Sequence, residues 1–392
     1  DPVNNFERYL INEGVITEEI VEKIRADIKK EIESNLEIAF AETLPPPNTE
    51  KELAELFAPY TTNLSTINNQ PSTNKRLIDA ISDGMRLAMR KHDNLVLMGQ
   101  DIADYGGVFK ITEGFVEEFG KERVRNTPLC ESAILGTGFG LSINGYKAMV
   151  EMQFADFVSE GMTQIVNNLA KSHYRWGQNA DVVVRMPTGA GVAAGPFHSQ
   201  SNEAWFFKTP GLKIVYPAFP ADAKGLLLTA FEDPNPVMYF EHKGLYRSIT
   251  EDVPDDYYAI PFGKAKLLRE GNDLTIVSYG LGVHWALEAL NENQNIKADL
   301  IDLRTLAPLD TEAIYGSVKK TGKVIVLHED TLTGGIGGEI AALINEHCFD
   351  YLDAPIMREG SLDTPVPMNA DLEINFLAKD RFKKKLLLLF NY

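Results

Sequence analysis

Cysteine is scarce in this sequence, because Cys130 and Cys348 are the two that its 392 residues contain. Two cysteines cannot form the disulfide framework of a small secreted domain, and they are typical of a reducing compartment, so we expect a cytoplasmic protein. Long apolar runs are missing too. Runs such as those at 182–184 and 386–390 fall far short of the roughly 18 residues of a membrane helix. The sequence therefore predicts a soluble protein with no membrane partner.

Basic residues are also in deficit, with 38 Lys and Arg against 56 Asp and Glu and a formal net charge of −18. No basic stripe is available to contact phosphates, which excludes a nucleic-acid backbone as a partner. The remaining composition, 44% hydrophobic and 24% charged, is that of an ordinary globular protein. At about 150 residues per domain, the length indicates two or three domains.

The N-terminal stretch differs from the rest in charge and in period. Residues 1–60 hold 14 acidic and 6 basic side chains. An apolar residue recurs there at every fourth position, namely Ile20, Ile24, Ile28, Ile32 and Leu36. This spacing predicts a helix with Thr17 as its N-cap, ending before the prolines at 45–47. We therefore expect a helical tail over 1–44 and a polar, Pro-containing linker over 45–74.

The rest of the chain alternates short β-rich runs with helical stretches. The β-rich runs lie at 95–98, 148–152, 182–186, 212–215, 237–240, 274–277, 298–301 and 324–327. Such alternation predicts doubly wound α/β domains with mainly parallel sheets. The acidic, Pro-containing stretch at 250–261 is the natural boundary between them. We expect one domain over 75–254 and a second over 261–392.

Two glycine clusters raise possible functions. Gly189, Gly191 and Gly195 follow a predicted strand, as the glycines of a nicotinamide dinucleotide site would, but their spacing is wrong for that motif. Because the glycines follow a strand, a nicotinamide-dependent dehydrogenase is kept as one alternative function despite their spacing. Gly136 and Gly138 fall inside a predicted helix, where glycine costs about 1 kcal/mol relative to alanine, which indicates a close backbone approach to a ligand or another helix.

Two side chains are candidates for catalysis. Glu131 stands where the glycine-containing helix begins, a place where an acidic residue is favoured by the helix dipole alone. His198 lies in a loop of Gly, Ser and Gln, where a histidine either takes part in binding or catalysis or merely faces solvent. The residues by themselves leave both alternatives open.

A series of motifs resembles a known protein family, and this resemblance indicates which alternative applies to Glu131 and His198. The segments lie at 99–102, 106–109, 126–131, 151–157, 198–201, 210–213 and 301–305. In this order they closely resemble the beta subunit of the thiamine diphosphate-dependent 2-oxo acid dehydrogenases, within the decarboxylating first component. The resemblance runs from about Lys75 to the end. It implies a thiamine diphosphate pyrimidine-binding domain followed by a transketolase-like C-terminal domain.

The resemblance also implies roles for particular residues. Glu131 matches the carboxylate that activates the cofactor through its aminopyrimidine ring, while Leu129, Gln153 and Phe157 match positions around that ring. His198 matches the histidine that handles protons near the substrate carbonyl and the lipoyl thiol. Gln100 departs from the pattern, since many relatives have Glu there as part of a proton relay.

Two ions follow from the same resemblance. Family members hold a structural potassium ion, whose ligands here would be Ala180, Val182, Val183, Ala230, Asp233 and Asn235. Magnesium and the cofactor's diphosphate are bound in this family by a Gly-Asp-Gly motif followed by Asn-Asn. Asn167 and Asn168 are present, but no Gly-Asp-Gly precedes them. The resemblance therefore implies that an alpha portion holds the magnesium and that this chain is inactive alone.

The implied activity is oxidative decarboxylation of a 2-oxo acid with acylation of the lipoyl group of a second component, which also carries a peripheral binding domain. Residues 106–109 and 153–157 favour 2-oxoisovalerate (3-methyl-2-oxobutanoate) over pyruvate or acetoin. Residues 1–60 resemble the C-terminal tail of an alpha subunit, which implies a fused alpha–beta polypeptide or, in its unfused form, a heterotetramer. A non-catalytic assembly or docking fragment is the alternative.

Overall fold

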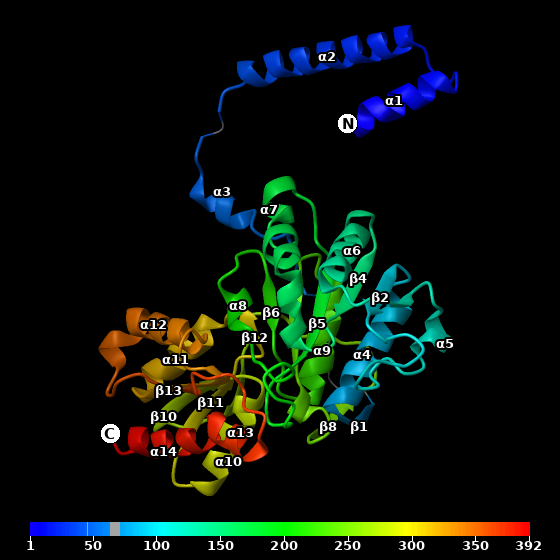
Figure 1. Ribbon diagram of the computed structural model, residues 1–392. Coiled ribbons are helices and arrows are strands. Elements are labelled where there is room, and N and C mark those ends of the chain that lie inside the picture. Colours follow the sequence, from blue (N-terminus) through cyan, green and yellow to red (C-terminus); the bar gives the residue numbers. More distant parts are fainter. Residues whose placement is uncertain (45, 63–70) are drawn as a thin grey trace. The chain divides into compact units, whose positions relative to one another are not determined.

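The protein divides into two compact units, Asp1–Ala54 and Glu55–Tyr392. The structure is a computed structural model that describes residues 1–44, 46–62 and 71–392 (Figure 1). The predicted linker 45–74 includes residues 45 and 63–70, which lie outside the described residues. No helix among the described residues is both long and apolar enough to cross a bilayer.

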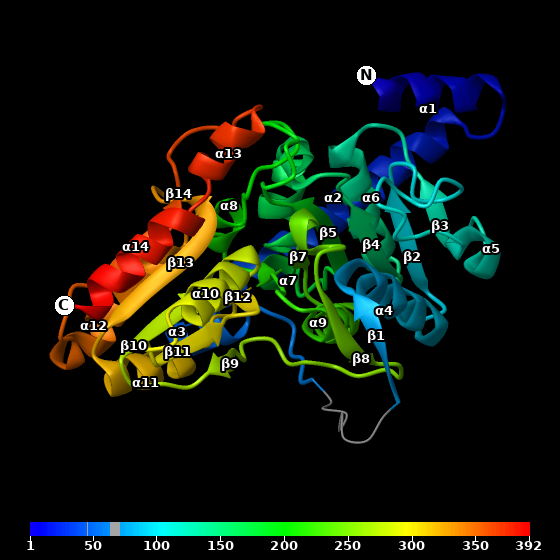
Figure 2. The ribbon, with the colours of Figure 1, turned by 90° about the horizontal axis from the view of Figure 1, so that it is seen from below.

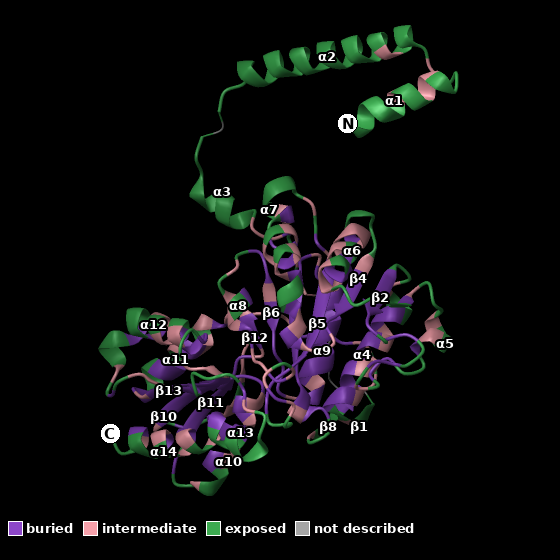
Figure 3. Ribbon diagram, in the orientation of Figure 1, coloured by how far each residue is buried: buried purple, intermediate pink, exposed green. Residues whose placement is uncertain are grey.

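The first unit consists of helices with largely exposed side chains. They are α1 (Pro2–Asn12), α2 (Glu18–Ala41) and α3 (Thr49–Ala54). Thr17 caps α2 as predicted, because its hydroxyl accepts the N–H of Ile20 at 3.3 Å. The predicted apolar stripe runs along α2 without being buried, and its Ile24 side chain is 48% exposed (Figure 3).

The second unit begins with a short extended segment inside the predicted linker. Asn235 accepts the N–H of Ala58 at 2.8 Å and donates its side-chain amide to the carbonyl of Ala58 at 3.0 Å. Tyr60 donates its hydroxyl to Glu232 at 3.0 Å. After the undescribed residues, β1 (Ser72–Arg76) pairs antiparallel with β8 (Thr250–Pro254), so part of the predicted boundary at 250–261 is a strand.

In the described residues, the first sheet of the second unit has seven strands, of which β12 alone runs antiparallel. Its spatial order is β12 (Thr305–Ala307), β6 (Lys213–Val215), β7 (Val237–His242), β5 (Val182–Thr188), β4 (Lys147–Glu151), β2 (Leu95–Gly99) and β3 (Val124–Asn126). The central strand β5 is buried along its whole length. Near-continuous apolar runs are expected where helices cover both faces of a parallel sheet.

Alternating side chains assign each face of this sheet to different helices. Val182 and Val184 face the core under α6 (Glu131–Ile143), while Val183 faces the core under α4 (Leu77–Lys91) and α9 (Pro220–Glu232). The shorter helices around the sheet are α5 (Phe115–Phe119), α7 (Ser172–Trp176), α8 (Ala204–Phe207) and the 3₁₀ turns η1 (Ala155–Gly161) and η3 (Lys243–Leu245).

Two features concern the helices on one face of this sheet. Residues 155–176 are wound in turn as η1, a π-helix η2 (Gln164–Leu169) and α7, with Asn167 and Asn168 in the π-helix. The close approach expected at Gly138 of α6 is present, but the helix approaches strand β4 of the sheet that it covers. A Cβ there would lie 2.8 Å from Val150.

The second sheet has five strands among the described residues. Its spatial order is β14 (Met357–Ser361), β13 (Val324–Thr331), β10 (Leu274–Ser278), β11 (Ala298–Asp302) and the antiparallel β9 (Lys266–Arg269). One face packs against α10 (Leu281–Glu292) and α14 (Lys379–Phe390), and the other against α11 (Thr311–Thr321) and α12 (Gly337–Cys348) (Figure 2). The 3₁₀ turn η4 (Phe349–Tyr351) and α13 (Ala370–Phe376) complete this lobe.

The two lobes of the second unit share one core. β12 leaves the second lobe and pairs with β6 at the edge of the first sheet. One hydrophobic cluster contains Met186 and Phe240 of the first sheet together with Val277 and Val326 of the second. The carboxyl ends of β5 and β7 therefore lie against the second lobe, which is where ligand sites form in open parallel sheets.

The close packing of α6 generates a prediction with an internal control. We expect Gly138→Ala to lower the free energy of unfolding by about 1–3 kcal/mol, because its methyl group collides with Val150. Gly140→Ala meets open space and should gain up to about 1 kcal/mol in helix propensity. Urea unfolding followed by tryptophan fluorescence measures both. Equal effects of the two variants would contradict the packing role of Gly138.

Candidate active site

Glu131 begins α6 and faces the end of strand β2. Its Oε1 accepts a hydrogen bond from the side-chain amide of Gln100 at 2.9 Å. Gln100 is buried, and its own Oε1 has no hydrogen-bond partner. A buried acceptor without a partner is unusual in a folded protein, so the place beside Glu131 is suited to a ligand with hydrogen-bond donors.

His198 lies in an aromatic cluster with two phenylalanines. Its ring centroid is 4.8 Å from that of Phe154 and 5.5 Å from that of Phe157, both in edge-on geometry. Phe154 had not been singled out from the sequence, although it stands between the predicted site residues Gln153 and Phe157. The structure therefore brings His198 and Phe157 together, and Phe154 contacts both rings.

The Phe157 segment packs beside the start of α6. Gly161 ends η1 so close to α6 that a Cβ there would lie 2.0 Å from Leu135 and 3.6 Å from the carbonyl oxygen of Glu131. Gln153 is half-buried at the end of β4, and Leu129 is 82% exposed just before α6. These residues border one region of the surface, and Leu129 makes no buried contact in it.

A buried ionic network, missed in the sequence, holds three neighbouring strand ends together. Arg185 of β5 donates to Glu241 of β7 at 2.5 and 2.7 Å and also pairs with Glu151 of β4. Tyr246 adds a hydrogen bond to Glu241 at 2.6 Å. The signal that could have revealed this network is a single charge at the end of each of three otherwise apolar runs.

The glycines at 189–195 form no dinucleotide loop. Gly189 has a φ of +91°, and a Cβ there would lie 2.1 Å from the His242 imidazole, so this glycine lets the chain pass over a buried ring. The next helix, α8, begins only at Ala204 and has four residues. The geometry of this loop thus offers no helix N-terminus for a pyrophosphate.

Several buried ionisable groups lie where this loop meets the second lobe. Burial would raise the pKa of Glu329, but the His242 charge and hydrogen bonds hold it below its ordinary value. Burial raises the pKa of Glu203, and the neighbouring Asp330 raises it further. Burial lowers the pKa of Lys243 to about 8, and its ammonium group donates to the carbonyl of Gly189 at 2.7 Å.

The predicted potassium ligands lie at the other end of β5. Asn235 donates to Asp233 Oδ1 at 2.7 Å, and Lys213 forms an ion pair with the other oxygen of Asp233. Asn235 Oδ1 in turn accepts the N–H of Ala58. These side-chain oxygens have partners within the protein, and the potassium ion stays a prediction from the resemblance. The other predicted ligands would contribute backbone carbonyls, namely Ala180, Val182, Val183 and Ala230.

The residues around Glu131 suit the pyrimidine ring of thiamine diphosphate. Glu131 supplies a carboxylate with one oxygen held by Gln100, and Phe157 supplies an aromatic face nearby. The described residues contain no group of three or more His, Cys, Asp or Glu side chains that could hold a metal ion. The residues present thus fit the ring of the cofactor.

Comparison with known proteins gives the family. The transketolase pyrimidine-binding domain matches residues 74–248, and the transketolase C-terminal domain matches residues 263–380. A 2-oxoisovalerate dehydrogenase subunit beta of Bacillus subtilis is 48% identical over 305 residues, covering 76% of this chain and 93% of the relative. This chain belongs to the 2-oxo acid dehydrogenase beta-subunit family.

Other members of the beta-subunit family are named for different substrates. The mitochondrial 2-oxoisovalerate dehydrogenase subunit beta 2 of Arabidopsis thaliana is 45% identical, covering 78% of this chain and 87% of the relative. The pyruvate dehydrogenase E1 component subunit beta of Bacillus subtilis is 41% identical, covering 75% and 91%. Residues before 74 lie outside both matched domains.

A solved structure supports the beta-subunit fold. A split-gene transketolase, described as an inactive beta4 tetramer, superposes with a TM-score of 0.65 over 80% of this chain and 99% of that chain. At 22% sequence identity, this likeness establishes the fold alone. It confirms the two-lobed, mainly parallel α/β architecture expected from the sequence.

The buried network predicts a large loss of stability when its cation is removed. Arg185→Leu leaves Glu151 and Glu241 buried without a counter-charge, which should cost about 3–5 kcal/mol of unfolding free energy. Arg125→Leu is the matched control, because Arg125 pairs with the exposed Glu122 at the surface and should cost less than about 1 kcal/mol. Urea unfolding compares them. A loss below about 1 kcal/mol in both variants would show that the network is not needed.

Proposed function

We propose that this chain is the beta portion of a branched-chain 2-oxo acid dehydrogenase that decarboxylates 2-oxoisovalerate and transfers the acyl group to a lipoyl carrier. The observation that carries the proposal is the pairing of Glu131 with Gln100 and of Phe157 with His198, in a chain of this family. Thiamine diphosphate, when bound, supplies the carbanion chemistry that releases carbon dioxide.

The preference for a branched-chain substrate rests on the relatives. Within one organism, Bacillus subtilis, the subunit named for 2-oxoisovalerate is 48% identical to this chain and the subunit named for pyruvate is 41% identical. Phe154 and Phe157 add apolar surface beside His198, in keeping with a branched alkyl group.

The chain's own residues have separate tasks in this proposal. Glu131 accepts a hydrogen bond from a ring nitrogen of the pyrimidine and thereby sets the proton balance of the ring. Gln100 orients that carboxylate by its hydrogen bond at 2.9 Å. His198 holds or moves a proton at the substrate oxygen, a task for which an imidazole is chemically suited. The edge-on phenylalanines restrict the orientation of its ring.

An alpha portion completes the site in this proposal by holding magnesium and the diphosphate. The absent Gly-Asp-Gly motif supports this division, as does the lack of a metal-binding cluster among the described residues. The exposed apolar side chains of Leu129 and Phe197, 82% and 72% accessible, border the site where a partner would cover them. Residues 1–60 are proposed to be the C-terminal tail of such an alpha portion within a fused polypeptide.

A second component with lipoyl and peripheral binding domains is the proposed acceptor. Its lipoyl group would approach His198, because His198 is proposed to handle protons near the substrate carbonyl and the lipoyl thiol. The C-terminal lobe, matched at 263–380, is the proposed docking surface for its peripheral binding domain. Cytoplasmic location stays a prediction from the low cysteine content.

The dependence on an alpha portion is directly testable. We expect the purified chain 1–392 to bind thiamine diphosphate with magnesium weakly and to show no decarboxylation of 2-oxoisovalerate. Adding an alpha subunit should restore both tight binding, measured by tryptophan quenching, and release of carbon dioxide. Robust decarboxylation by the chain alone would contradict the proposed division of the site, and no activity with the alpha subunit would favour a non-catalytic assembly module.

The role of Glu131 is tested in the assembled enzyme. Glu131→Gln should lower the rate of hydrogen–deuterium exchange at the reactive cofactor carbon and the turnover by about 10²-fold or more, because the amide cannot replace the carboxylate. Glu270→Gln removes an exposed carboxylate in the second lobe and serves as the control. If Glu131→Gln kept near-full turnover, Glu131 would not be the activating carboxylate.

A further inference from the structure

The loop at 189–203 connects β5 with α8 and carries His198. Its first part has an unusual backbone, since Gly191 has a φ of +84° and Ala193, which has a side chain, has a φ of +55°. A residue with a side chain adopts this left-handed conformation only where its surroundings stabilise it. First-lobe residues hold both ends of the loop, through Lys243 at Gly189 and Asp156 at Gln200, and the contacts to Gly191 and Ala193 come from the second lobe.

Glu373 of α13 binds both of these unusual residues. Its two carboxylate oxygens divide between them: Oε1 accepts the N–H of Gly191 at 3.0 Å, and Oε2 accepts the N–H of Ala193 at 2.9 Å. The side chain of Glu373 is buried. A carboxylate that accepts from two backbone amides forms charge-assisted hydrogen bonds, which are about twice as strong as neutral ones.

Glu329 of β13 holds the two ends of the same loop. Its Oε1 accepts the N–H of Ala190 at 2.6 Å and the hydroxyl of Ser201 at 3.2 Å. Its Oε2 lies 2.5 Å from Nε2 of His242, which belongs to β7 of the first lobe. This carboxylate thus joins the start and the end of the loop to the second lobe.

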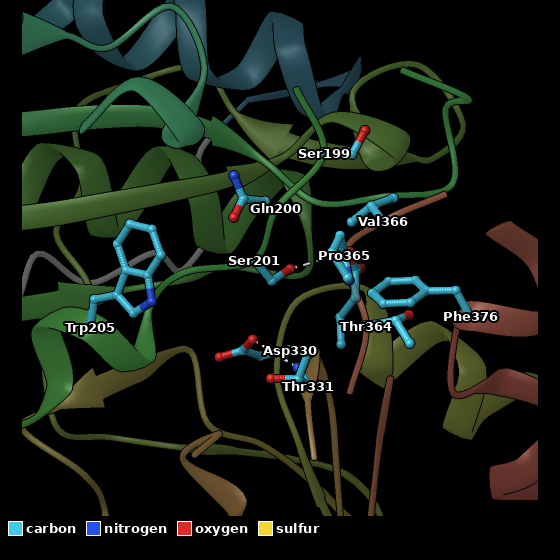
Figure 4. A pocket seen from close by; sticks show the side chains of 11 residues that line it. Ser199, Gln200, Ser201, Trp205, Asp330, Thr331, Thr364, Pro365, Val366 and Phe376 are labelled. Atoms are coloured by element: carbon cyan, nitrogen blue, oxygen red, sulfur yellow. Dashed lines mark hydrogen bonds between the residues drawn. The ribbon is translucent and has the colours of Figure 1, made fainter. Parts of the chain in front are cut away.

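Apolar contacts support the two carboxylates. Ala190 packs in a small hydrophobic cluster with Val366 and Phe376 of the second lobe. Gly195 lies so close to Met368 that a Cβ there would be 2.3 Å from its sulfur. Figure 4 shows Ser199, Gln200 and Ser201 of the loop on one side of a cavity of about 150 Å³ and Thr364, Pro365, Val366 and Phe376 on the other.

His198 is thus positioned from both lobes. Its ring rests edge-on against Phe154 and Phe157 of the first lobe. The backbone before it is held by Glu373 of the second lobe, and the backbone after it by Asp156 of the first lobe, which accepts the N–H of Gln200 at 3.1 Å. A shift of the loop by about 1 Å would move the imidazole away from the reacting atoms, and misplacements of that size can cost about 10²-fold in rate.

We infer that Glu373 is a positioning residue for His198, which fixes the loop at 189–203 through the amides of Gly191 and Ala193. This inference rests on the proposed function, since it assigns to Glu373 the placement of the histidine that the proposal uses. Gln at position 373 would have one side-chain acceptor for two N–H groups, so one of the two amides would lose its partner.

The first experiment needs no activity. In the full chain carrying ¹³C-labelled histidine, the NMR signal of His198, assigned with a His198→Asn variant, should be displaced by the ring currents of Phe154 and Phe157. Glu373→Gln should move this signal toward its random-coil position and raise the amide exchange of the segment 190–198 by at least about tenfold. Asp371→Asn, which removes an exposed charge from the same helix, is the control and should change neither.

The second experiment uses the enzyme assembled with an alpha subunit. Glu373→Gln should lower kcat by about 10- to 100-fold and leave the KM for the 2-oxo acid and the affinity for thiamine diphosphate within about threefold of wild type. Asp371→Asn should match the wild type. An unchanged His198 signal, or a kcat of Glu373→Gln equal to that of the control, would overturn this inference while the wild-type activity upheld the proposed function. An inactive wild-type assembly would overturn both.

Discussion

The site depends on one buried interaction, the guanidinium of Arg185 between the carboxylates of Glu151 and Glu241. Glu151 and Glu241 stand at or next to the carboxyl ends of β4 and β7, and Arg185 lies in the middle of β5 between them. Each of these three adjacent parallel strands continues into a segment of the site. β4 leads to Gln153, Phe154 and Phe157, β5 leads to the loop of His198, and β7 ends at His242. Because a buried cation needs its carboxylate partners within ion-pair distance, the network fixes the relative positions of the three segments that follow these strands.

The second lobe acts on the same place from outside the sheet. Its carboxylates bind backbone amides and a histidine of the first lobe, so the site is assembled within one compact unit although these hydrogen-bonded residues are up to 182 positions apart in sequence. The site is also open, since Leu129 and Phe197 present apolar surface beside it. One side of the pocket is therefore rigid in this chain, and the other is supplied by a partner in the proposed enzyme.

Much of the architecture could be predicted because its signals are local. Apolar runs marked β2, β4, β5, β6, β7, β10, β11 and β13, whereas the short or polar strands β3, β9, β12 and β14 carried no such signal. Thr17 marked the start of α2, and Glu131 was expected at the start of the helix where the structure places it. The site residues beyond that came from family resemblance. Glu373 could not be found, since nothing near it in sequence shows that it faces amides at 191 and 193. The π-helix at Gln164–Leu169 was likewise hidden, because a run of helix-forming residues does not show how tightly it is wound.

Strand β12 has a further consequence for how this polypeptide can be divided. It comes from the C-terminal lobe, yet it completes the edge of the first sheet beside β6, and the hydrophobic core runs without interruption between the lobes. A gene cut between the two matched domains would leave the first fragment with an unpaired strand edge and the second with an unsupported strand. The two lobes have separate sequence patterns, but they share a sheet edge and a core and therefore fold together. Recombination between related genes can thus exchange both lobes together more readily than one lobe alone.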